Sequence, residues 1–178
     1  MKYTRSTHLA HHPFVRLILS SYLNIAPETI NLSSTRQGKP ILLNNDCLFF
    51  NLSGTRDQYA LAISQLVDVG VDIESHKPRK NLTGLAESVL SNSELTRFRQ
   101  LPCEHQQDYF YRAWSLKEAT LKADGRGITL PLQSIGFDTN STIGAVGWNE
   151  TLGNKNRWDW YYFKLEGISL ALATRTTS

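Results

Sequence analysis

The sequence predicts an α+β fold in which helices and short antiparallel strands are arranged in two similar halves. Helical spacing and strand alternation occur in separate segments along the chain. The 178 residues, 40% of them hydrophobic and 20% charged, suffice for one globular unit or two fused halves with a real core. A weak internal repeat supports the duplication. It matches Phe14 and Arg16 with Phe110 and Arg112, and Leu61-Ala62-Ile63 with Leu170-Ala171-Leu172.

The first part of the chain reads as one helix followed by short strands. Pro13 suits the first turn of a helix, and the apolar residues after it keep helical spacing to about Asn24. A basic turn containing Gly38, Lys39 and Pro40 then separates two strand-like segments, and two further segments read as a hairpin. The expected strands are 30–34, 40–43, 47–52 and 59–64.

Residues 69–74, with the sequence VGVDIE, are expected to form a strand. Apolar residues alternate there with Gly70, Asp72 and Glu74, which is the period of a half-buried strand. The two carboxylates therefore lie on the same side of the strand, about 7 Å apart.

The middle of the chain reads as helices and the end as strands. Ser91-Asn92-Ser93-Glu94 has the form of a capping box, which opens a helix to about Leu101 after an earlier helix over 81–90. Another helix is expected in the stretch from Phe110 to Ile128. The strands expected after it are 134–138, 143–148, 158–165 and 168–174, the last two joined by a Glu166-Gly167 hairpin turn.

Trp158, Trp160 and Tyr162 form an aromatic stripe on one side of an expected strand. Such a stripe can stack on nucleic-acid bases, but this one lacks interleaved basic residues. We therefore favour a sheet face that is covered by a helix.

Trp114, Glu118 and Lys122 recur every four residues and so share one helix face. Taken alone, a Glu–Lys pair at this spacing is usually a solvated surface pair. Glu118 together with Asp72 and Glu74 would nevertheless supply three carboxylates around one hard cation. Mg²⁺ is the expected ion, because it binds few carboxylates and fills its other positions with water and substrate phosphate oxygens.

The same stretches resemble the 4'-phosphopantetheinyl transferases, specifically the pseudodimeric type that activates peptide and fatty-acid synthases. That family has a G-V/I-D-I/L-E strand, then W-x-x-K-E-A, a lysine and G-x-G-I/L in order. The matching segments here are Gly70-Val71-Asp72-Ile73-Glu74, Trp114-Ser115-Leu116-Lys117-Glu118-Ala119, Lys122 and Gly125-Arg126-Gly127-Ile128.

The resemblance implies a fold and an activity. Two α+β halves, here 1–70 and 71–178, would each pack a helix on a small antiparallel sheet and form an intramolecular pseudodimer. The activity would be transfer of the phosphopantetheine arm from coenzyme A to a serine of an acyl- or peptidyl-carrier protein, with release of 3',5'-ADP. The alternatives are a degenerate homologue that binds coenzyme A or a carrier protein without turnover, and an unrelated Mg²⁺-dependent phosphohydrolase.

The resemblance also implies roles for individual residues. Asp72, Glu74 and Glu118 would hold Mg²⁺, Glu118 would take the serine proton, and Lys122 would meet the diphosphate. Asp72 and Glu118 are expected to line a solvent-filled cleft. The coenzyme would be held by Ser53 and by a G-K-P turn. The candidates for coenzyme contact are Lys39, Pro40, Ser53 and Arg16.

Three residues carry further expectations. Gly54 stands where the family usually has a histidine, which puts a contact to the 3'-phosphate of coenzyme A in doubt. Lys117 points about 100° away from Glu118 on a helix, so we expected a surface or substrate-edge position. Trp114 was expected to serve packing.

Charge and composition exclude several other classes. The net charge of +3 is well short of that of a dedicated nucleic-acid binder and fits an acidic protein partner better, with the basic loop 75–80 as a docking candidate. Cys47 and Cys103 are expected to be free thiols, and we assign His8, His11 and His12 no metal. The apolar runs are too short to span a bilayer. We expect a cytoplasmic monomer.

Overall fold

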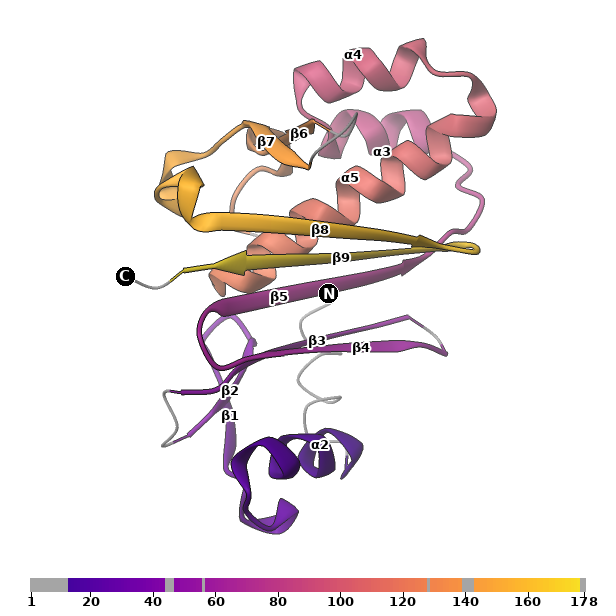
Figure 1. Cartoon of the computed structure of the whole chain (residues 1–178). Helices are drawn as coiled ribbons and strands as arrows, with labels where there is room; N and C mark the ends of the chain where they lie inside the picture. The colour runs from indigo at the N-terminus through magenta and orange to yellow at the C-terminus, as the bar shows by residue number, and fades with distance from the viewer. Residues whose placement is uncertain (1–12, 44–46, 56, 128, 139–142, 177–178) are drawn as a thin grey trace.

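The computed structural model describes residues 13–43, 47–55, 57–127, 129–138 and 143–176. Within them the chain is an α+β protein, as the sequence predicted (Figure 1). The helices are α2 (Pro13–Leu23), α3 (Leu82–Val89), α4 (Asn92–Gln100) and α5 (Cys103–Asp124). The strands are β1 (Leu32–Ser34), β2 (Pro40–Leu42), β3 (Phe49–Gly54), β4 (Tyr59–Ser64), β5 (Asp68–Ser75), β6 (Gly136–Asp138), β7 (Gly144–Gly147), β8 (Trp158–Leu165) and β9 (Ile168–Arg175).

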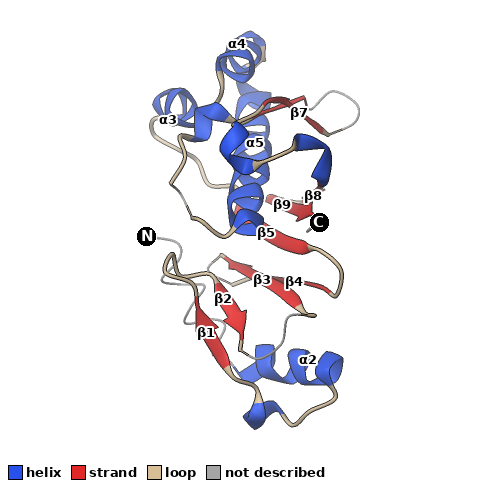
Figure 2. Ribbon diagram, turned by 90° about the vertical axis from the view of Figure 1, so that its left-hand side faces the viewer, coloured by secondary structure: helices blue, strands red, loops and turns tan. Residues whose placement is uncertain are grey.

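All described strand pairs are antiparallel. The largest sheet has the order β5-β9-β8, and β3 pairs with β4 in a separate hairpin. In Figure 2 the layers follow one another as helix α5, the three-stranded sheet, the β3–β4 hairpin and helix α2. Strand β5 therefore lies between helix α5 and the β3–β4 hairpin. The contact between β5 and α5 is called the seam below.

The expected boundary between the two halves falls within strand β5. The strand begins at Asp68 and pairs along its whole length with β9, so a boundary between residues 70 and 71 falls inside a strand. The division into halves 1–70 and 71–178 stays a prediction.

Three buried clusters form the core. One lies between α5 and the strands β6 to β9, one between α3, α4 and α5, and one between α2 and the β3–β4 hairpin. The capping box at the start of α4 is confirmed, with Ser91 and Glu94 each bonded to the other's backbone N–H. The aromatic stripe of β8 faces α5 as expected, because Trp160 Nε1 donates to Thr120 Oγ1 at 2.9 Å.

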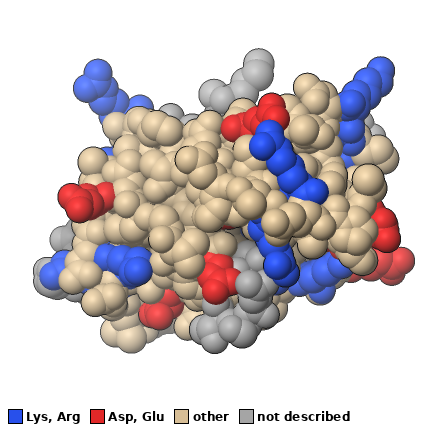
Figure 3. Space-filling model, turned by 90° about the horizontal axis from the view of Figure 1, so that it is seen from above, with Lys and Arg blue, Asp and Glu red and all other residues tan. Residues whose placement is uncertain are grey.

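Several expectations about composition can be compared with the structure. Cys47 and Cys103 are both exposed, and no disulfide joins them. The three N-terminal histidines and Ile128 lie outside the described residues. None of the described helices is both long enough and apolar enough to cross a bilayer. On the face seen from above, basic and acidic side chains are interspersed (Figure 3).

Candidate active site at the seam of β5 and α5

Helix α5 lies directly against β5, and Gly70 makes the close approach possible. A Cβ at this position would come within 2.1 Å of the Ala119 carbonyl oxygen and 2.2 Å of the Ala123 backbone nitrogen. Only glycine fits such a contact with backbone atoms. Since Asp72 and Glu74 share the side of β5 on which Gly70 lies, they also face the helix.

Asp72, Ser53 and Lys122 form one buried cluster. Lys122 Nζ donates to Asp72 Oδ1 at 2.8 Å, to Ser53 Oγ at 2.8 Å and to the Val71 carbonyl oxygen at 3.1 Å, which uses all three of its protons. Asp72 is 0% exposed and Lys122 is 6% exposed. The expectation that Asp72 and Glu118 line a solvent-filled cleft was therefore wrong, because their exposed fractions are 0% and 1%.

The β3–β4 hairpin is tied to β5 by side chains instead of a backbone ladder. Asn51 Oδ1 accepts from the Val71 backbone nitrogen at 2.9 Å, and Ser53 Oγ accepts from that of Ile73 at 3.2 Å. Ser53 Oγ also donates to Asp72 Oδ1 at 3.1 Å. Sequence reasoning singled out Ser53 but missed Asn51, although the alternation of β3 places both on the same side of the strand.

Glu74 on β5 and Glu118 on α5 lie in line with Asp72 and Lys122, and together these four side chains form a row along the seam. Trp114 Nε1 donates to Glu74 Oε1 at 2.9 Å, so this tryptophan orients a carboxylate in addition to packing near Phe110. Glu118 lies one helical turn from Trp114 and one from Lys122 and is 1% exposed. The helix face Trp114, Glu118 and Lys122 thus runs along the strand face that carries Glu74 and Asp72.

The three carboxylates fit Mg²⁺ by chemistry, but they do not converge in this conformation. Their donors are all oxygens, as Mg²⁺ prefers, and Asp72 Oδ2 is buried with no hydrogen-bond partner among the described residues. The described part of the chain contains no group of three His, Cys, Asp or Glu side chains already placed to hold an ion. Binding would require side-chain rotation in the seam.

The residues expected to hold the coenzyme are not all brought together. Lys39 is buried, and its Nζ donates to the Ala123 carbonyl oxygen at 3.0 Å at the C-terminal end of α5. Burial lowers the pKa of Lys39. Pro40, the first residue of β2, is also buried. The guanidinium of Arg16, in contrast, bonds the carbonyl oxygens of Ile30 and Pro27 near α2, and none of these bonds reaches the seam.

The prediction for Lys117 was wrong. This lysine was expected at the surface, yet it is 0% exposed, and its Nζ donates to Glu94 Oε2 at 2.6 Å and to the Val89 carbonyl oxygen at 2.7 Å. The other oxygen of Glu94 accepts from the Phe137 backbone nitrogen at 2.9 Å. Burial lowers the pKa of Lys117, although Glu94 opposes this effect. Lys117 therefore fastens α5 to the start of α4.

Sequence reasoning also missed a chain of hydrogen bonds at the end of β5. Asp108 Oδ1 is 3.1 Å from His76 Nδ1, and His76 Nε2 is 2.8 Å from Ser169 Oγ. This order resembles a catalytic Ser-His-Asp triad. Ser169, however, is 0% exposed and also bonds Tyr162, so no substrate carbonyl can reach its hydroxyl. These hydrogen bonds connect the end of β5 to β9 through Ser169 and to α5 through Asp108.

The basic loop after β5 is held in place by Tyr111. The tyrosine hydroxyl accepts from the Lys77 backbone nitrogen at 3.1 Å and from Arg79 Nε at 3.0 Å. Lys77, Arg79 and Lys80 are nevertheless exposed. The loop thus presents fixed positive charge close to the Glu74 end of the seam.

Comparison with known proteins identifies the family to which the residues of this site belong. The family model of the 4'-phosphopantetheinyl transferase superfamily matches residues 68–174, which include β5 and α5. The transferase HetI of Nostoc is 36% identical over 117 residues, covering 64% of this chain and 49% of that protein. The transferase AcpT of Escherichia coli O157:H7 is 32% identical over 161 residues, covering 90% of this chain and 73% of that protein. The chain thus spans about half the length of several of the curated relatives that it matches.

Solved structures agree on the fold. Holo-acyl-carrier-protein synthase of Thermotoga maritima superposes with a TM-score of 0.54 at 21% identity, covering 64% of this chain and 65% of that chain. The Bacillus anthracis synthase, solved in complex with CoA (3',5'-ADP), gives a TM-score of 0.54 at 16% identity, covering 64% of this chain and 99% of that chain. With the family model matching more than half of its residues, the chain belongs to the 4'-phosphopantetheinyl transferase superfamily.

Proposed function

We propose that this protein transfers the 4'-phosphopantetheine arm of coenzyme A to a serine hydroxyl of an acyl- or peptidyl-carrier protein and releases 3',5'-ADP. The observation that carries the proposal is the seam itself. Strand β5 and helix α5, both within the family match, bring Asp72, Glu74, Glu118 and Lys122 into one row. Phosphoryl transfer needs positioning and charge stabilisation more than covalent chemistry from the protein, and these residue types supply both.

Each side chain of the row has a proposed role. Glu118 accepts the proton of the attacking serine, because it is the carboxylate between the two ends of the row. Lys122 exchanges its bond to Asp72 for the diphosphate and stabilises the charge that develops there. Trp114 keeps Glu74 turned into the seam.

The proposed metal is Mg²⁺, held by Asp72, Glu74 and Glu118. When bound, it would supply positive charge that offsets the negative charge of the diphosphate. The buried Oδ2 of Asp72 supports this assignment, since a carboxylate oxygen without a hydrogen bond costs free energy unless a cation or donor compensates it.

Coenzyme A would be gripped from the β3–β4 side. Ser53, whose hydroxyl already lies against Lys122, is the proposed phosphate contact. Lys39 and Pro40 are the proposed contacts from the preceding turn, and Lys39 would have to leave the Ala123 carbonyl to serve. Arg16 is the weakest candidate because its guanidinium is already bonded near α2.

The carrier protein would dock on the basic loop that contains Lys77, Arg79 and Lys80. If an acidic carrier binds there, kcat/KM for the carrier should fall steeply between low and moderate salt, while kcat/KM for coenzyme A falls less. Charge reversal at Arg79 should flatten the slope for the carrier, whereas reversal of the exposed Arg99 on α4, paired with Glu87, should leave it unchanged. If kcat/KM for the carrier and for coenzyme A fell equally with salt, this loop would not be the docking site.

One alternative has an observation in its favour. A homologue that binds coenzyme A or a carrier protein without turnover would be free to keep Lys122 and Asp72 locked together, as they are here. A Mg²⁺-dependent phosphohydrolase would use the same carboxylates with water as the nucleophile.

A single assay separates these functions. The protein is incubated with coenzyme A, Mg²⁺ and an apo-carrier protein, and the carrier is weighed by mass spectrometry. Transfer predicts the mass increment of phosphopantetheine on the carrier and its loss when the acceptor serine is changed to alanine. An unmodified carrier with intact coenzyme A would support the binding-only alternative, and hydrolysed coenzyme A with an unmodified carrier would support the phosphohydrolase.

A further inference from the structure

Arg79, in the basic loop after β5, is held at one side of its guanidinium and exposed at the other. Its Nε donates to the Tyr111 hydroxyl at 3.0 Å, and its Cζ lies 5.8 Å from the centroid of the Tyr111 ring. Its terminal nitrogens, Nη1 and Nη2, donate to none of the residues that the structure describes. Because Arg79 is an exposed residue, these terminal nitrogens are open to a ligand.

Tyr111, which holds Arg79, is itself fixed by its surroundings. It is 1% exposed, and its ring stacks on that of His76 with 4.5 Å between the centroids and 8° between the planes. Its hydroxyl accepts from the Lys77 backbone nitrogen at 3.1 Å and donates to the Lys77 carbonyl oxygen at 3.2 Å. With the bond from Arg79, the hydroxyl uses its proton and both of its lone pairs. Helix α5 therefore holds both the backbone of the loop and one side chain in it.

The place of this contact relates the loop to the seam. Lys77 follows Glu74 by three residues along the chain, and Tyr111 precedes Trp114 by three residues along α5. Trp114 in turn holds Glu74, so neighbouring positions of one helix fix both the end of β5 and the loop after it. A group bound at Arg79 therefore lies at a set distance from the proposed site.

In the proposed function the partner is an acidic carrier protein, and on that basis we propose that Tyr111 positions Arg79 as a two-point receptor for a carboxylate of the carrier. The planar end of a guanidinium donates two parallel hydrogen bonds to one carboxylate, whereas an ammonium group acts as a point charge. A side chain that is ordered before binding also loses less conformational freedom when the partner arrives. Recognition thus depends on the shape and aim of one cation, in addition to the charge of the loop.

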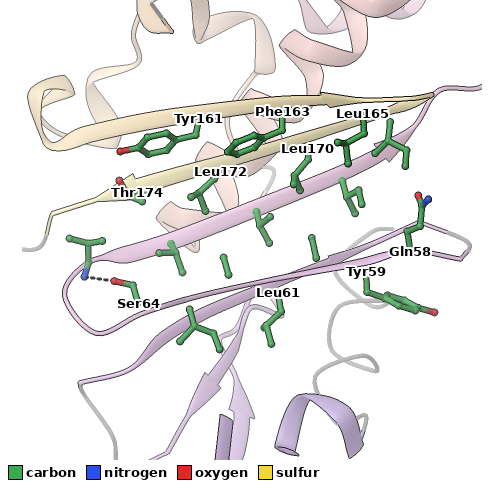
Figure 4. A pocket seen from close by; sticks show the side chains of 18 residues that line it. Gln58, Tyr59, Leu61, Ser64, Tyr161, Phe163, Leu165, Leu170, Leu172 and Thr174 are labelled. Atoms are coloured by element: carbon green, nitrogen blue, oxygen red, sulfur yellow. Dashed lines mark hydrogen bonds between the residues drawn. The ribbon is translucent and has the colours of Figure 1, made fainter. Parts of the chain in front are cut away.

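The opposite face of the sheet offers an acidic partner no comparable contact. A groove lies there between the β5-β9-β8 sheet and strand β4 (Figure 4). None of its 18 lining residues is Asp, Glu, Lys, Arg or His. A carboxylate would find no counter-charge in this groove, which favours the basic loop as the place where an acidic partner is recognised.

Calorimetric titration with an acidic apo-carrier protein, without coenzyme A, tests the contact. Arg79→Lys keeps the charge but removes the planar fork, and the Kd should rise about tenfold, which is about 1.4 kcal/mol. Tyr111→Phe keeps the ring but removes the hydroxyl, and the Kd should rise by a similar factor. The double variant should bind about as weakly as either single variant, because both changes remove the same contact.

Two matched controls accompany these variants. Arg99→Lys makes the same charge-conserving change at an exposed arginine of α4 that pairs with Glu87. Tyr162→Phe removes another hydroxyl, which lies 2.7 Å from Ser169 Oγ. Both controls should bind the carrier with the Kd of the parent, and circular dichroism confirms that every variant is folded.

A second measurement needs no carrier and follows the positioning directly. In ¹H–¹⁵N spectra the Arg79 Nε–H, assigned by its loss in Arg79→Lys, should exchange slowly with solvent because the Tyr111 hydroxyl accepts its proton. The exchange should become fast in Tyr111→Phe and stay slow in Tyr162→Phe. Fast exchange in the parent would show that Tyr111 does not hold Arg79.

Several binding results would also overturn the contact. These are a parent that does not bind the acidic carrier, an Arg79→Lys variant that binds like the parent, additive losses in the double variant, and equal weakening by the controls. A parent that shows the expected binding pattern but transfers no phosphopantetheine would refute the proposed function and leave this contact intact. A parent that transfers the arm while Arg79→Lys binds unchanged would refute the contact alone.

Discussion

Gly70→Ala should damage both the stability and the activity of this protein. The new Cβ would lie 2.1 Å from the Ala119 carbonyl oxygen, whereas an ordinary carbon–oxygen contact is about 3.3 Å. The helix must therefore retreat by about 1.2 Å, because the atoms it meets belong to the backbone of α5 and cannot rotate away. Overpacking of this kind costs about 1–3 kcal/mol, and we expect the upper end in the free energy of unfolding.

The retreat also separates the two sides of the proposed site. A misplacement of about 1 Å lowers a catalysed rate about a hundredfold, so transfer should fall by that order even where the variant is fully folded. Urea unfolding and the carrier-modification rate measure the two effects. Gly144→Ala is the matched control, since a Cβ there meets nothing within 4 Å. A Gly70→Ala variant as stable and as active as the parent would refute the close packing of α5 on β5.

Three further predictions address other features. Lys117→Met should lower the free energy of unfolding by about 3–5 kcal/mol, because it leaves Glu94 buried without its cation, and the double variant with Glu94→Gln should recover part of the loss in urea titrations. Burial lowers the pKa of His76 despite Asp108, so on acidification below about pH 6.5 the unfolded state takes up this proton first. Stability should therefore fall as the pH drops from about 6.5 toward the lower folded-state pKa of His76, and level off below it, where both states carry the proton. The fall should be less steep in His76→Gln, and parallel curves would contradict this. Gly54→His, in strand β3, should improve discrimination between coenzyme A and its 3'-dephospho form about ten- to a hundredfold in kcat/KM, and strong discrimination by the parent would show that other groups hold the 3'-phosphate.

The elements and the order of the site residues could be predicted from the sequence because their signals are local. The alternation of VGVDIE places two carboxylates on one side of a strand, and the four-residue spacing of Trp114, Glu118 and Lys122 places them on one helix face. The capping box at Ser91 and the Glu166-Gly167 turn are equally local, and both strands and helices formed where these signals lie.

What could not be predicted depends on contacts between distant residues. Lys117 read as a surface lysine because its partner Glu94 lies 23 residues away and becomes its neighbour only when α4 folds onto α5. The burial of Asp72 depends on Ser53 from the β3–β4 hairpin, which no periodicity in β5 reveals. The link between His76 and Ser169 spans 93 residues and is invisible in the sequence for the same reason.

The central claim is that the row of residues between β5 and α5 carries out the transfer, and replacing the proposed base tests it most directly. Glu118→Gln keeps the volume of the side chain and removes its charge, while Glu104→Gln makes the same change at an exposed position of the same helix. The measurement is the rate of carrier modification by mass spectrometry with excess Mg²⁺, alongside circular dichroism. We predict a loss of at least about a hundredfold for Glu118→Gln and none for Glu104→Gln. A folded Glu118→Gln variant that modifies the carrier at the parent rate would contradict the account.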